Sequence, residues 1–261
     1  MKRVWILNHY AQVPGGPGGT RHYHFAEYLP DYGWHATVIA ASTEGKTGKQ
    51  RLGKGETCRL DHFGSVPFLW VKTPTYQGNG IGRMLNMLAY CWQVLRPGIT
   101  KGLYKPDVII GSSVHPFAAA AGAILARRFK VPFVFEVRDL WPQTLIDMGR
   151  LSENALVTRV LKKLELWLYK RAARIVVLLP LAHQYIEALG IQKEKIAWIP
   201  NGVDISLFNN QAEPKDGDVF TLMYFGAHGG ANGLDNVLQA MRIVQEKKGG
   251  QSIQLRLIGD G

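Results

Sequence analysis

Short apolar runs, many of them rich in β-branched residues, alternate along the chain with segments long enough to form helices. The strands that this pattern predicts are 4–7, 36–40, 67–71, 107–111, 132–137, 175–179 and 196–199. The helices predicted between them are 20–29, 81–95, 116–129, 155–172 and 181–189. Nearly continuous apolar strands separated by helices are typical of parallel sheets. The pattern therefore predicts an α/β fold with a doubly wound, Rossmann-like parallel sheet and right-handed crossovers.

This alternation stops near Pro200 and resumes after a polar stretch. The stretch contains Asn209, Asn210 and Pro214, a composition typical of linkers, and a strand–helix–strand unit is predicted after it at 220–225, 234–247 and 253–258. We divide the chain into a first domain (1–200), a hinge or linker (201–217) and the incomplete start of a second domain (218–261). One βαβ unit leaves a sheet face uncovered, so we expect exposed apolar surface there and a sequence that stops inside the second domain.

Composition narrows the classes of protein that fit. No apolar run approaches the ~20 residues of a membrane span and no signal peptide precedes the first strand, so we expect a cytoplasmic location. Cys58 and Cys91 are far apart and belong to no paired motif, which argues against a disulfide framework and a zinc site. The net charge of +11 favours an anionic partner.

A glycine-rich loop follows the first predicted strand. Gly15, Gly16, Gly18 and Gly19 allow backbone N–H groups to approach an anion, and Thr20 is a suitable N-cap for the helix that begins there. The loop lies at the carboxyl end of a strand, where open α/β sheets bind ligands. We predict a binding site for donor phosphates, and a glycine loop without a ligand is the alternative.

A dinucleotide-dependent dehydrogenase is a competing interpretation of this loop. Its fingerprint requires a tight turn with a third glycine three positions after the second, whereas Arg21 follows Gly18 at that distance here. The loop is also too long for that turn. Glu44, just after the second strand, could still imitate the acid that binds ribose, so this alternative stays open.

Two further groups of polar residues follow middle strands. His115 ends one strand and precedes Pro116, and it could bind a sugar hydroxyl or simply cap the next helix. Glu136, Arg138 and Asp139 follow the next strand. Arg138 could fork onto a phosphate, with Asp139 orienting it or accepting a hydrogen bond from a sugar hydroxyl, and a structural ion pair is the alternative.

The basic surface has two interpretations. The segment from Ile81 to Leu103 combines apolar and basic residues, which suits either an interfacial helix beside a lipid-borne acceptor or a helix packed on the core. Other basic residues near helix ends either face solvent or bind anionic lipid. They are dispersed and no reader motif accompanies them, which argues against nucleic acid.

In this order the motifs resemble those of family 4 retaining glycosyltransferases of the GT-B fold. The resemblance covers the whole chain and is closest to bacterial enzymes of O-antigen and capsule assembly, including L-fucosamine transferases. The motifs that carry it are the glycine loop, His115-Pro116, the Glu-Val-Arg-Asp-Leu-Trp-Pro block at 136–142, Ile-Pro-Asn-Gly-Val-Asp at 199–204 and Tyr-Phe-Gly at 224–226.

This resemblance implies a nucleotide-sugar donor, UDP-linked, held mainly by the second domain, and an acceptor held by the first. Transfer would retain the anomeric configuration, without an obligatory metal or other cofactor. It places Gly18 and Gly19 near the donor phosphates and His115, as catalytic residue, at the donor sugar. The second-domain phosphate site would contain Gly226, His228, Gly229 and Gly230.

The chain also departs from the family pattern. Ala227 and Asn232 stand where many members carry an Arg and a Lys that neutralise the leaving diphosphate, although His228 could partly substitute. The family's paired glutamates and base-binding loops would lie beyond Gly261. Because each lost donor costs roughly 3 kcal/mol of transition-state stabilisation, we expect little or no activity from these 261 residues alone.

The sequence thus indicates a glycosyltransferase of bacterial surface polysaccharide biosynthesis, which would transfer a sugar to a lipid-linked or saccharide acceptor. We expect it in the cytoplasm, as a peripheral protein on the inner face of the cell membrane. Two alternatives remain: a non-catalytic module that binds the acceptor, and a sugar-nucleotide epimerase of the same architecture.

Overall fold

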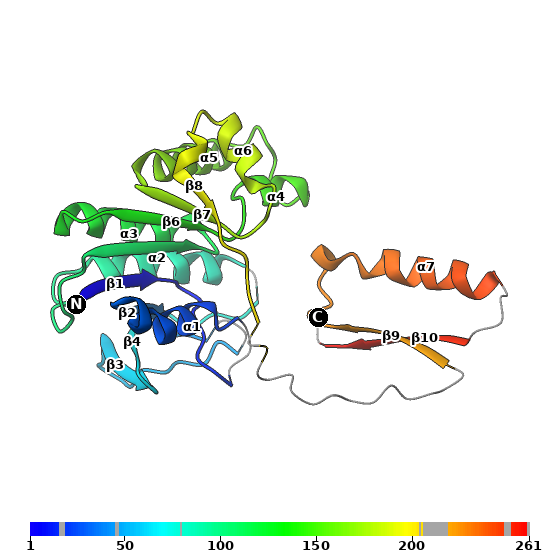
Figure 1. Cartoon of the computed structure of the whole chain (residues 1–261), viewed down its shortest axis with the longest axis horizontal. Coiled ribbons are helices and arrows are strands. Elements are labelled where there is room, and N and C mark those ends of the chain that lie inside the picture. Colours follow the sequence, from blue (N-terminus) through cyan, green and yellow to red (C-terminus); the bar gives the residue numbers. More distant parts are fainter. Residues whose placement is uncertain are drawn as a thin grey trace. The chain divides into compact units, whose positions relative to one another are not determined.

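The computed structural model describes residues 1–15, 19–44, 47–78, 80–203, 205, 219–247 and 252–259. The chain separates into two units, Met1–Gly202 (unit 1) and Val203–Gly261 (unit 2), which Figure 1 shows in sequence colours. Most of the predicted linker, from 206 to 217, lies outside the described residues.

Unit 1 is built on an eight-stranded sheet with the order β3-β4-β2-β1-β5-β6-β7-β8 (Figure 1). All neighbouring strands are parallel except β3 and β4. The strands are β1 (Lys2–Leu7), β2 (Trp34–Ala41), β3 (Cys58–Phe63), β4 (Val66–Val71), β5 (Val108–Ser113), β6 (Phe133–Val137), β7 (Arg174–Val177) and β8 (Ile196–Trp198). The predicted α/β fold with a doubly wound, largely parallel sheet is therefore confirmed.

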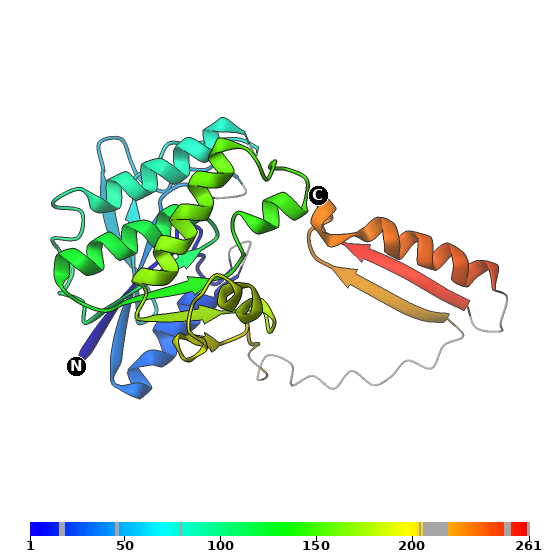
Figure 2. The same ribbon diagram turned by 90° about the horizontal axis from the view of Figure 1, so that it is seen from above.

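Helices cover both faces of this sheet (Figure 2). The α-helices are α1 (Arg21–Tyr28), α2 (Ile81–Leu95), α3 (Pro116–Phe129), α4 (Gln143–Asp147), α5 (Leu156–Arg171) and α6 (Ala182–Ala188), with 3₁₀ turns η1 (Leu29–Tyr32) and η2 (Lys193–Lys195). α1 packs on one face with Val4 and Val38, whereas α2, α3 and α5 pack on the other, where Trp5 and Ile39 are buried. In the described part of the chain, no helix is long and apolar enough to cross a membrane.

The antiparallel strand β3 was missed by the sequence prediction. It pairs with β4 through a tight turn at Gly64, whose φ of 59° lies in the left-handed region that glycine adopts most readily. Its side chains are only partly covered, since β3 is an edge strand. Half-exposed polar residues in a short edge strand give a weaker apolar signal than a buried parallel strand does.

The contact between α3 and β5 is unusually close, and small residues allow it. A Cβ on Gly111 of β5 would lie 2.8 Å from the Cα of Ala119 and 2.9 Å from the ring of Phe133. One on Gly122 of α3 would lie 3.3 Å from the Cα of Gly111. The alanine-rich face of α3 therefore rests directly on the strand that ends beside His115.

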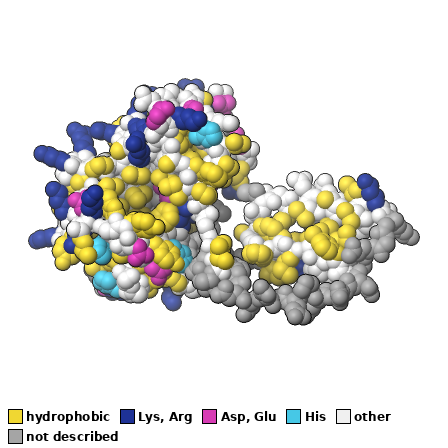
Figure 3. All heavy atoms as spheres, in the orientation of Figure 1, with side chains coloured by type: hydrophobic (Ala, Val, Ile, Leu, Met, Phe, Trp, Pro, Cys, Tyr) yellow, Lys and Arg dark blue, Asp and Glu magenta, His cyan; other side chains and the backbone are white. Residues whose placement is uncertain are grey.

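Unit 2 contains β9 (Val219–Phe225), η4 (Gly230–Asn232), α7 (Leu234–Glu246) and β10 (Ser252–Ile258). β9 and β10 form a separate two-stranded parallel sheet. Hydrophobic side chains gather on the face of unit 2 seen in Figure 3, and those of Phe220, Met223 and Phe225 are more than half exposed. This matches the exposed apolar surface expected of a single βαβ unit.

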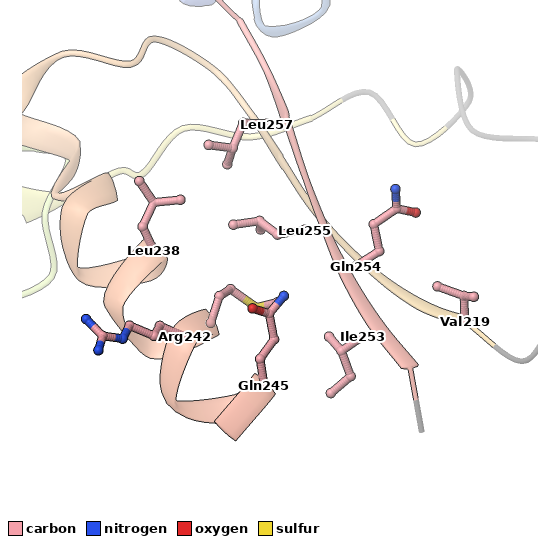
Figure 4. Close-up of a pocket in the computed structure, with 9 residues that line it drawn as sticks. Val219, Leu238, Arg242, Gln245, Ile253, Gln254, Leu255 and Leu257 are labelled. Atoms are coloured by element: carbon pink, nitrogen blue, oxygen red, sulfur yellow. The ribbon is translucent and has the colours of Figure 1, made fainter. Parts of the chain in front are cut away.

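A groove of about 710 Å³ lies between α7 and the two strands of unit 2 (Figure 4). Its lining is mostly aliphatic, with Leu238, Leu255 and Leu257 among the side chains that point into it. Arg242 at its rim is paired with Glu246 of its own helix. We interpret this groove as the packing layer between helix and sheet, because it contains no cluster of groups suited to chemistry.

Candidate functional site

The strand order of unit 1 reverses between β1 and β5. The chain moves outward from β1 to β2 and β4, then returns to place β5 against the other side of β1. In open α/β sheets, ligands bind beyond the carboxyl ends of the strands at such a reversal. The residues that follow β1 and β5 are therefore the first candidates for a functional site.

Two buried histidines meet at this reversal. His9 follows β1, His115 follows β5, and their ring centroids lie 4.8 Å apart in an edge-to-face arrangement. Both side chains are almost completely buried. Among the described residues, the ring nitrogens of His115 have no hydrogen-bond partner, and those of His9 have none at ordinary hydrogen-bond geometry, although the Asn86 side chain interacts with His9. Buried polar atoms without partners are rare, so these nitrogens are candidates for hydrogen bonds with a ligand.

Both histidines are neutral at physiological pH. Burial lowers the pKa of His9 to about 3, and the positive charge of Arg83 adds to this while Asn86 opposes it. Burial also lowers the pKa of His115 well below its usual value, with further contributions from His9 and Arg83. A neutral imidazole offers one N–H donor and one nitrogen acceptor, so each ring can bind a hydroxyl group.

The histidine pair is bordered by Tyr10 and Arg83. Arg83 of α2 donates through Nε to the hydroxyl oxygen of Tyr10 at 3.0 Å, and its guanidinium lies over the Tyr10 ring. Tyr10 in turn packs edge-on against His115, with ring centroids 5.9 Å apart. α2 therefore contributes a positive charge at the edge of the site.

A charged network follows the end of β6. The buried carboxylate of Glu136 accepts a hydrogen bond from Arg21 Nε at 2.8 Å and contacts His22 Nε2 at 2.6 Å. Burial opposes ionisation of Glu136, but the interactions with His22 and Arg21 outweigh it and hold its pKa well below the usual value. The structural ion pair considered at this strand therefore joins Glu136 to the start of α1, not to Arg138.

Arg138 and the end of the glycine loop lie together. A Cβ on Gly19 would be 4.0 Å from a terminal nitrogen of Arg138. The Arg138 side chain makes no hydrogen bond or ion pair within the described residues, and only its backbone N–H donates, to Ser113 Oγ at 3.2 Å. Partial burial raises the pKa of Asp139, which the charge of Arg138 opposes. Asp139 does not orient Arg138 through a hydrogen bond.

Neither of the two side-chain caps considered from the sequence is formed. Thr20 occupies the N-cap position of α1, but its side chain forms no capping hydrogen bond because the backbone there has φ −94° and ψ 15°. His115 precedes α3, which begins at Pro116 as predicted, and its side chain does not cap the helix either. Gly16 and Gly18 lie outside the described residues, so Gly19 represents the loop.

Glu44 is engaged within its own loop. It pairs with Arg51 at 3.1 Å and accepts a hydrogen bond from the Thr47 hydroxyl. A carboxylate held in this way is not presented to a ribose. The dehydrogenase alternative therefore loses the residue on which it depended.

The predicted glycines of unit 2 lie at the carboxyl ends of its strands. Gly226 donates through its N–H to the Ile258 carbonyl, and a Cβ on Gly259 would overlap the Gly226 carbonyl oxygen and lie 3.1 Å from His228 Nε2. Gly229 precedes η4 and Gly230 is its first residue, and both are exposed. Asn232 donates to the Ala227 carbonyl at 2.7 Å, so its side chain shapes the loop.

Sequence reasoning missed His9, Arg21, His22 and Arg83. His9 could have been found, because it follows a buried strand in the same way as His115 does. No local pattern singles out Arg21 and His22, because their partner Glu136 is 114 residues away from His22. Within the described ranges, no group of three or more His, Cys, Asp or Glu side chains is placed to hold a metal ion.

A family model described as "Glycosyl transferase 4-like domain" matches residues 16–202. A relative that is 26% identical over 179 residues is "Probable glycosyltransferase WbjE" of Pseudomonas aeruginosa. The alignment covers 62% of this chain and 42% of that relative. The chain therefore spans less than half of the length of this larger protein.

Two solved structures share the fold at low sequence identity. One is the catalytic domain of starch synthase IV from Arabidopsis thaliana bound to ADP and acarbose, with a TM-score of 0.64, 12% identity, and coverage of 98% of this chain and 68% of that one. The other is Anabaena Alr3699/HepE in complex with UDP and glucose, with a TM-score of 0.58, 17% identity, and coverage of 100% and 61%.

Proposed function

The chain belongs to the glycosyl transferase 4-like domain family, and from this we propose that it forms part of an enzyme that transfers a sugar from a UDP-sugar donor. The acceptor would be a lipid-linked or other saccharide in bacterial surface polysaccharide assembly, of the O-antigen or capsule type. Transfer would retain the anomeric configuration. Unit 1 would hold the acceptor and unit 2 would begin the donor-binding domain.

One observation carries this proposal: Arg138, whose side chain makes no hydrogen bond or ion pair with any described residue, lies beside the end of the glycine loop. Arg138 lies next to Gly19, at the start of α1, and the neighbouring carboxylate of Glu136 is already paired with Arg21 and hydrogen-bonded to His22. A guanidinium and a helix N-terminus together favour a diphosphate. The fold neighbours with bound ADP or UDP support a nucleotide donor.

His115 would act at the donor sugar. Since its imidazole is neutral and its nitrogens have no partner among the described residues, it is suited to hydrogen-bond a sugar hydroxyl and not to neutralise phosphate. Tyr10 packs against His115 and Arg83 is hydrogen-bonded to Tyr10, so the sugar would enter beside these two side chains.

Calorimetry with UDP and UMP tests the phosphate assignment. We expect weak binding of UDP by the whole chain, and Arg138→Gln should weaken it about tenfold or more, the effect of one charge-assisted hydrogen bond. Arg174→Gln is the matched control, because Arg174 begins β7 and so lies at the amino ends of the strands. Equal affinity of the wild type and Arg138→Gln for UDP would contradict the proposed role of Arg138.

We also propose that this chain alone transfers sugar very slowly. In unit 2 the residues at the predicted positive positions are Ala227 and Asn232, and Asn232 is occupied with the loop backbone. Loss of one preorganised donor costs roughly 3 kcal/mol, about a hundredfold in rate. Mass spectrometry of UDP-sugar incubations should detect no more than trace UDP release, and rapid turnover would contradict this expectation.

The exposed face of α2 is suited to contact an anionic membrane, and we propose that the acceptor is bound there. Ile81, Leu85, Leu88 and Trp92 recur at helical spacing and are exposed, Trp92 to 71%. The opposite face of the helix buries Met87, Tyr90 and Val94 against the core, as the core-packed alternative predicts, and the exposed face is the one that we propose lies at the membrane.

Basic side chains accompany this apolar stripe. Arg128 of α3 donates to the Leu95 carbonyl at the end of α2, which places its charge beside the stripe. Arg96 and Lys101 follow in the sequence and are exposed. Apolar side chains flanked by Lys and Arg are typical of helices that lie in the interface of anionic bilayers.

Vesicle flotation tests this membrane face. The wild type should float with vesicles containing phosphatidylglycerol at low salt and not with pure phosphatidylcholine, and Leu85→Ser with Trp92→Ser should abolish flotation. Tyr32→Ser is the control, since Tyr32 is 79% exposed on η1 of the other sheet face. Unchanged flotation of the double variant would contradict this orientation.

A further inference from the structure

All three guanidinium nitrogens of Arg21 donate hydrogen bonds, and only one of these nitrogens donates to Glu136. Nε donates to Glu136 Oε1 at 2.8 Å, while the two terminal nitrogens donate to the carbonyl oxygens of Pro200 at 2.7 Å and Ile199 at 2.8 Å. The side chain is 8% exposed and also lies over the ring of Phe25. Such a planar fork, with acceptors on several sides, is a geometry that lysine cannot reproduce.

The acceptors of Arg21 belong to a short segment with little other support. Ile199 and Pro200 directly follow β8, the edge strand of the sheet, and both residues are exposed. Unit 1 ends at Gly202, two residues after Pro200. The segment that leads out of unit 1 is therefore fastened to the first residue of α1, and not only to its own strand.

Glu136, which accepts the Nε hydrogen bond of Arg21, is also held by His22 and, through His22, by Asn8. Asn8 Oδ1 accepts the backbone N–H of Tyr10 at 3.1 Å, so its amide group donates to His22 Nδ1 at 2.7 Å. This hydrogen bond leaves the His22 proton on Nε2, which donates to Glu136. Asn8, His22, Glu136 and Arg21 thus form one chain of hydrogen bonds from the end of β1 to the segment after β8.

We propose that Arg21 is a positioning residue that fixes where the chain leaves unit 1 and couples this exit to the anion site at Gly19. Arg21 follows Gly19 by two residues, and Gly19 lies beside Arg138. An anion held there restrains the start of α1, and through Arg21 it restrains residues 199–200. The coupling, unlike the fastening itself, rests on the proposed binding of a nucleoside diphosphate.

Hydrogen–deuterium exchange of the whole chain without ligand tests the fastening. The Ile199 amide, which is bonded to the Val177 carbonyl, should exchange about tenfold or more faster in Arg21→Gln, and Arg21→Lys should lie between the variant and the wild type. Arg59→Gln is the matched control, since Arg59 is also ion-paired but belongs to β3 at the opposite edge of the sheet.

Two results would overturn this proposal. One is equal exchange at Ile199 in the wild type and Arg21→Gln. The other is acceleration spread evenly over unit 1 in both Arg21 variants, which would make Arg21 a general stabilising residue. If Arg21→Gln fails to fold, Arg21→Lys and Glu136→Gln decide the question. Each keeps part of the network while weakening the hydrogen bonds that the Arg21 guanidinium makes.

Addition of UDP tests the coupling separately. UDP should slow exchange at Ile199 in the wild type and leave it unchanged in Arg21→Lys at saturating ligand. Equal slowing in both proteins would overturn the coupling. If UDP does not bind the wild type, the coupling and the proposed function fail together, whereas the ligand-free comparison still decides whether Arg21 holds the exit.

Discussion

Similar apolar strands have opposite surroundings in the two units. β4 of unit 1 buries nearly every side chain, whereas almost all of β9 in unit 2 is exposed although its residues are as hydrophobic. Helices cover both faces of the unit 1 sheet, and one helix accompanies the two strands of unit 2 (Figure 1). The comparison teaches that apolar sequence specifies strands, while the number of covering layers decides how much each side chain stabilises the fold.

The units also differ in their polar groups. Unit 1 contains buried groups linked over long sequence distances, such as Glu136 with Arg21 and His22. Among the described residues of unit 2, Arg242 pairs with Glu246, and this is a local pair on an exposed helix face. Buried networks respond strongly to substitution and pH, whereas exposed pairs contribute little.

The largest expected effect is that of Phe68→Ala in β4. Phe68 is fully buried and stacks on Trp70 at 5.2 Å, so its truncation should lower the free energy of unfolding by about 3–5 kcal/mol. Urea denaturation followed by tryptophan fluorescence measures this directly, because all seven tryptophans lie in unit 1. A loss smaller than about 1 kcal/mol would mean that the unit 1 core is not packed as described.

A second effect concerns Glu165 of α5, which is buried and accepts hydrogen bonds from the hydroxyls of Tyr169 and Tyr185. Burial raises its pKa from 4.5 to about 7, although the tyrosine hydrogen bonds oppose this. The folded state therefore holds the proton more tightly than the unfolded chain. The stabilisation is complete below pH 4.5 and is lost as pH rises through 7, by up to roughly 3 kcal/mol.

Glu165→Gln isolates this contribution. The wild type minus variant difference in unfolding free energy should fall between pH 5 and pH 8, because glutamine does not titrate. Glu246→Gln in unit 2 is the control, and its difference should stay flat because that pair is exposed. A difference independent of pH for Glu165→Gln would show that this carboxyl group ionises normally.

The smallest expected effect is that of Phe220→Ala in β9. Phe220 is 51% exposed, so the change should cost about 1 kcal/mol or less. Hydrogen exchange of the β9 and β10 amides is the suitable measurement, since unit 2 has no tryptophan. A loss as large as that of Phe68→Ala would erase the contrast between the units and indicate that Phe220 is covered in solution.

The sequence predicted much of the fold because burial leaves a strong periodic signal. The helices predicted at 81–95 and 116–129 are α2 and α3 with the same bounds. β3 and α4 were missed because one is a half-exposed edge strand and the other is very short.

The site was less accessible to sequence reasoning. His115 and Arg138 stood out because they follow strands, and the structure places His115 against His9 and Arg138 beside Gly19. The pairing of Glu136 with Arg21 depends on bringing distant segments together at one sheet edge, and no local pattern records such a pairing. Capping by Thr20 failed because the actual backbone angles differ from those that its residue type favours.

The contact of Gly111 with Ala119 and Gly122 has a mechanical consequence. With no side chain between them, strand β5 and helix α3 cannot slide or tilt against each other without backbone collision. His115 lies between the end of β5 and the start of α3, so this close packing holds its backbone in place. We therefore expect any adjustment to an incoming ligand to occur at Tyr10 and Arg83, which border His115 from a loop and from α2.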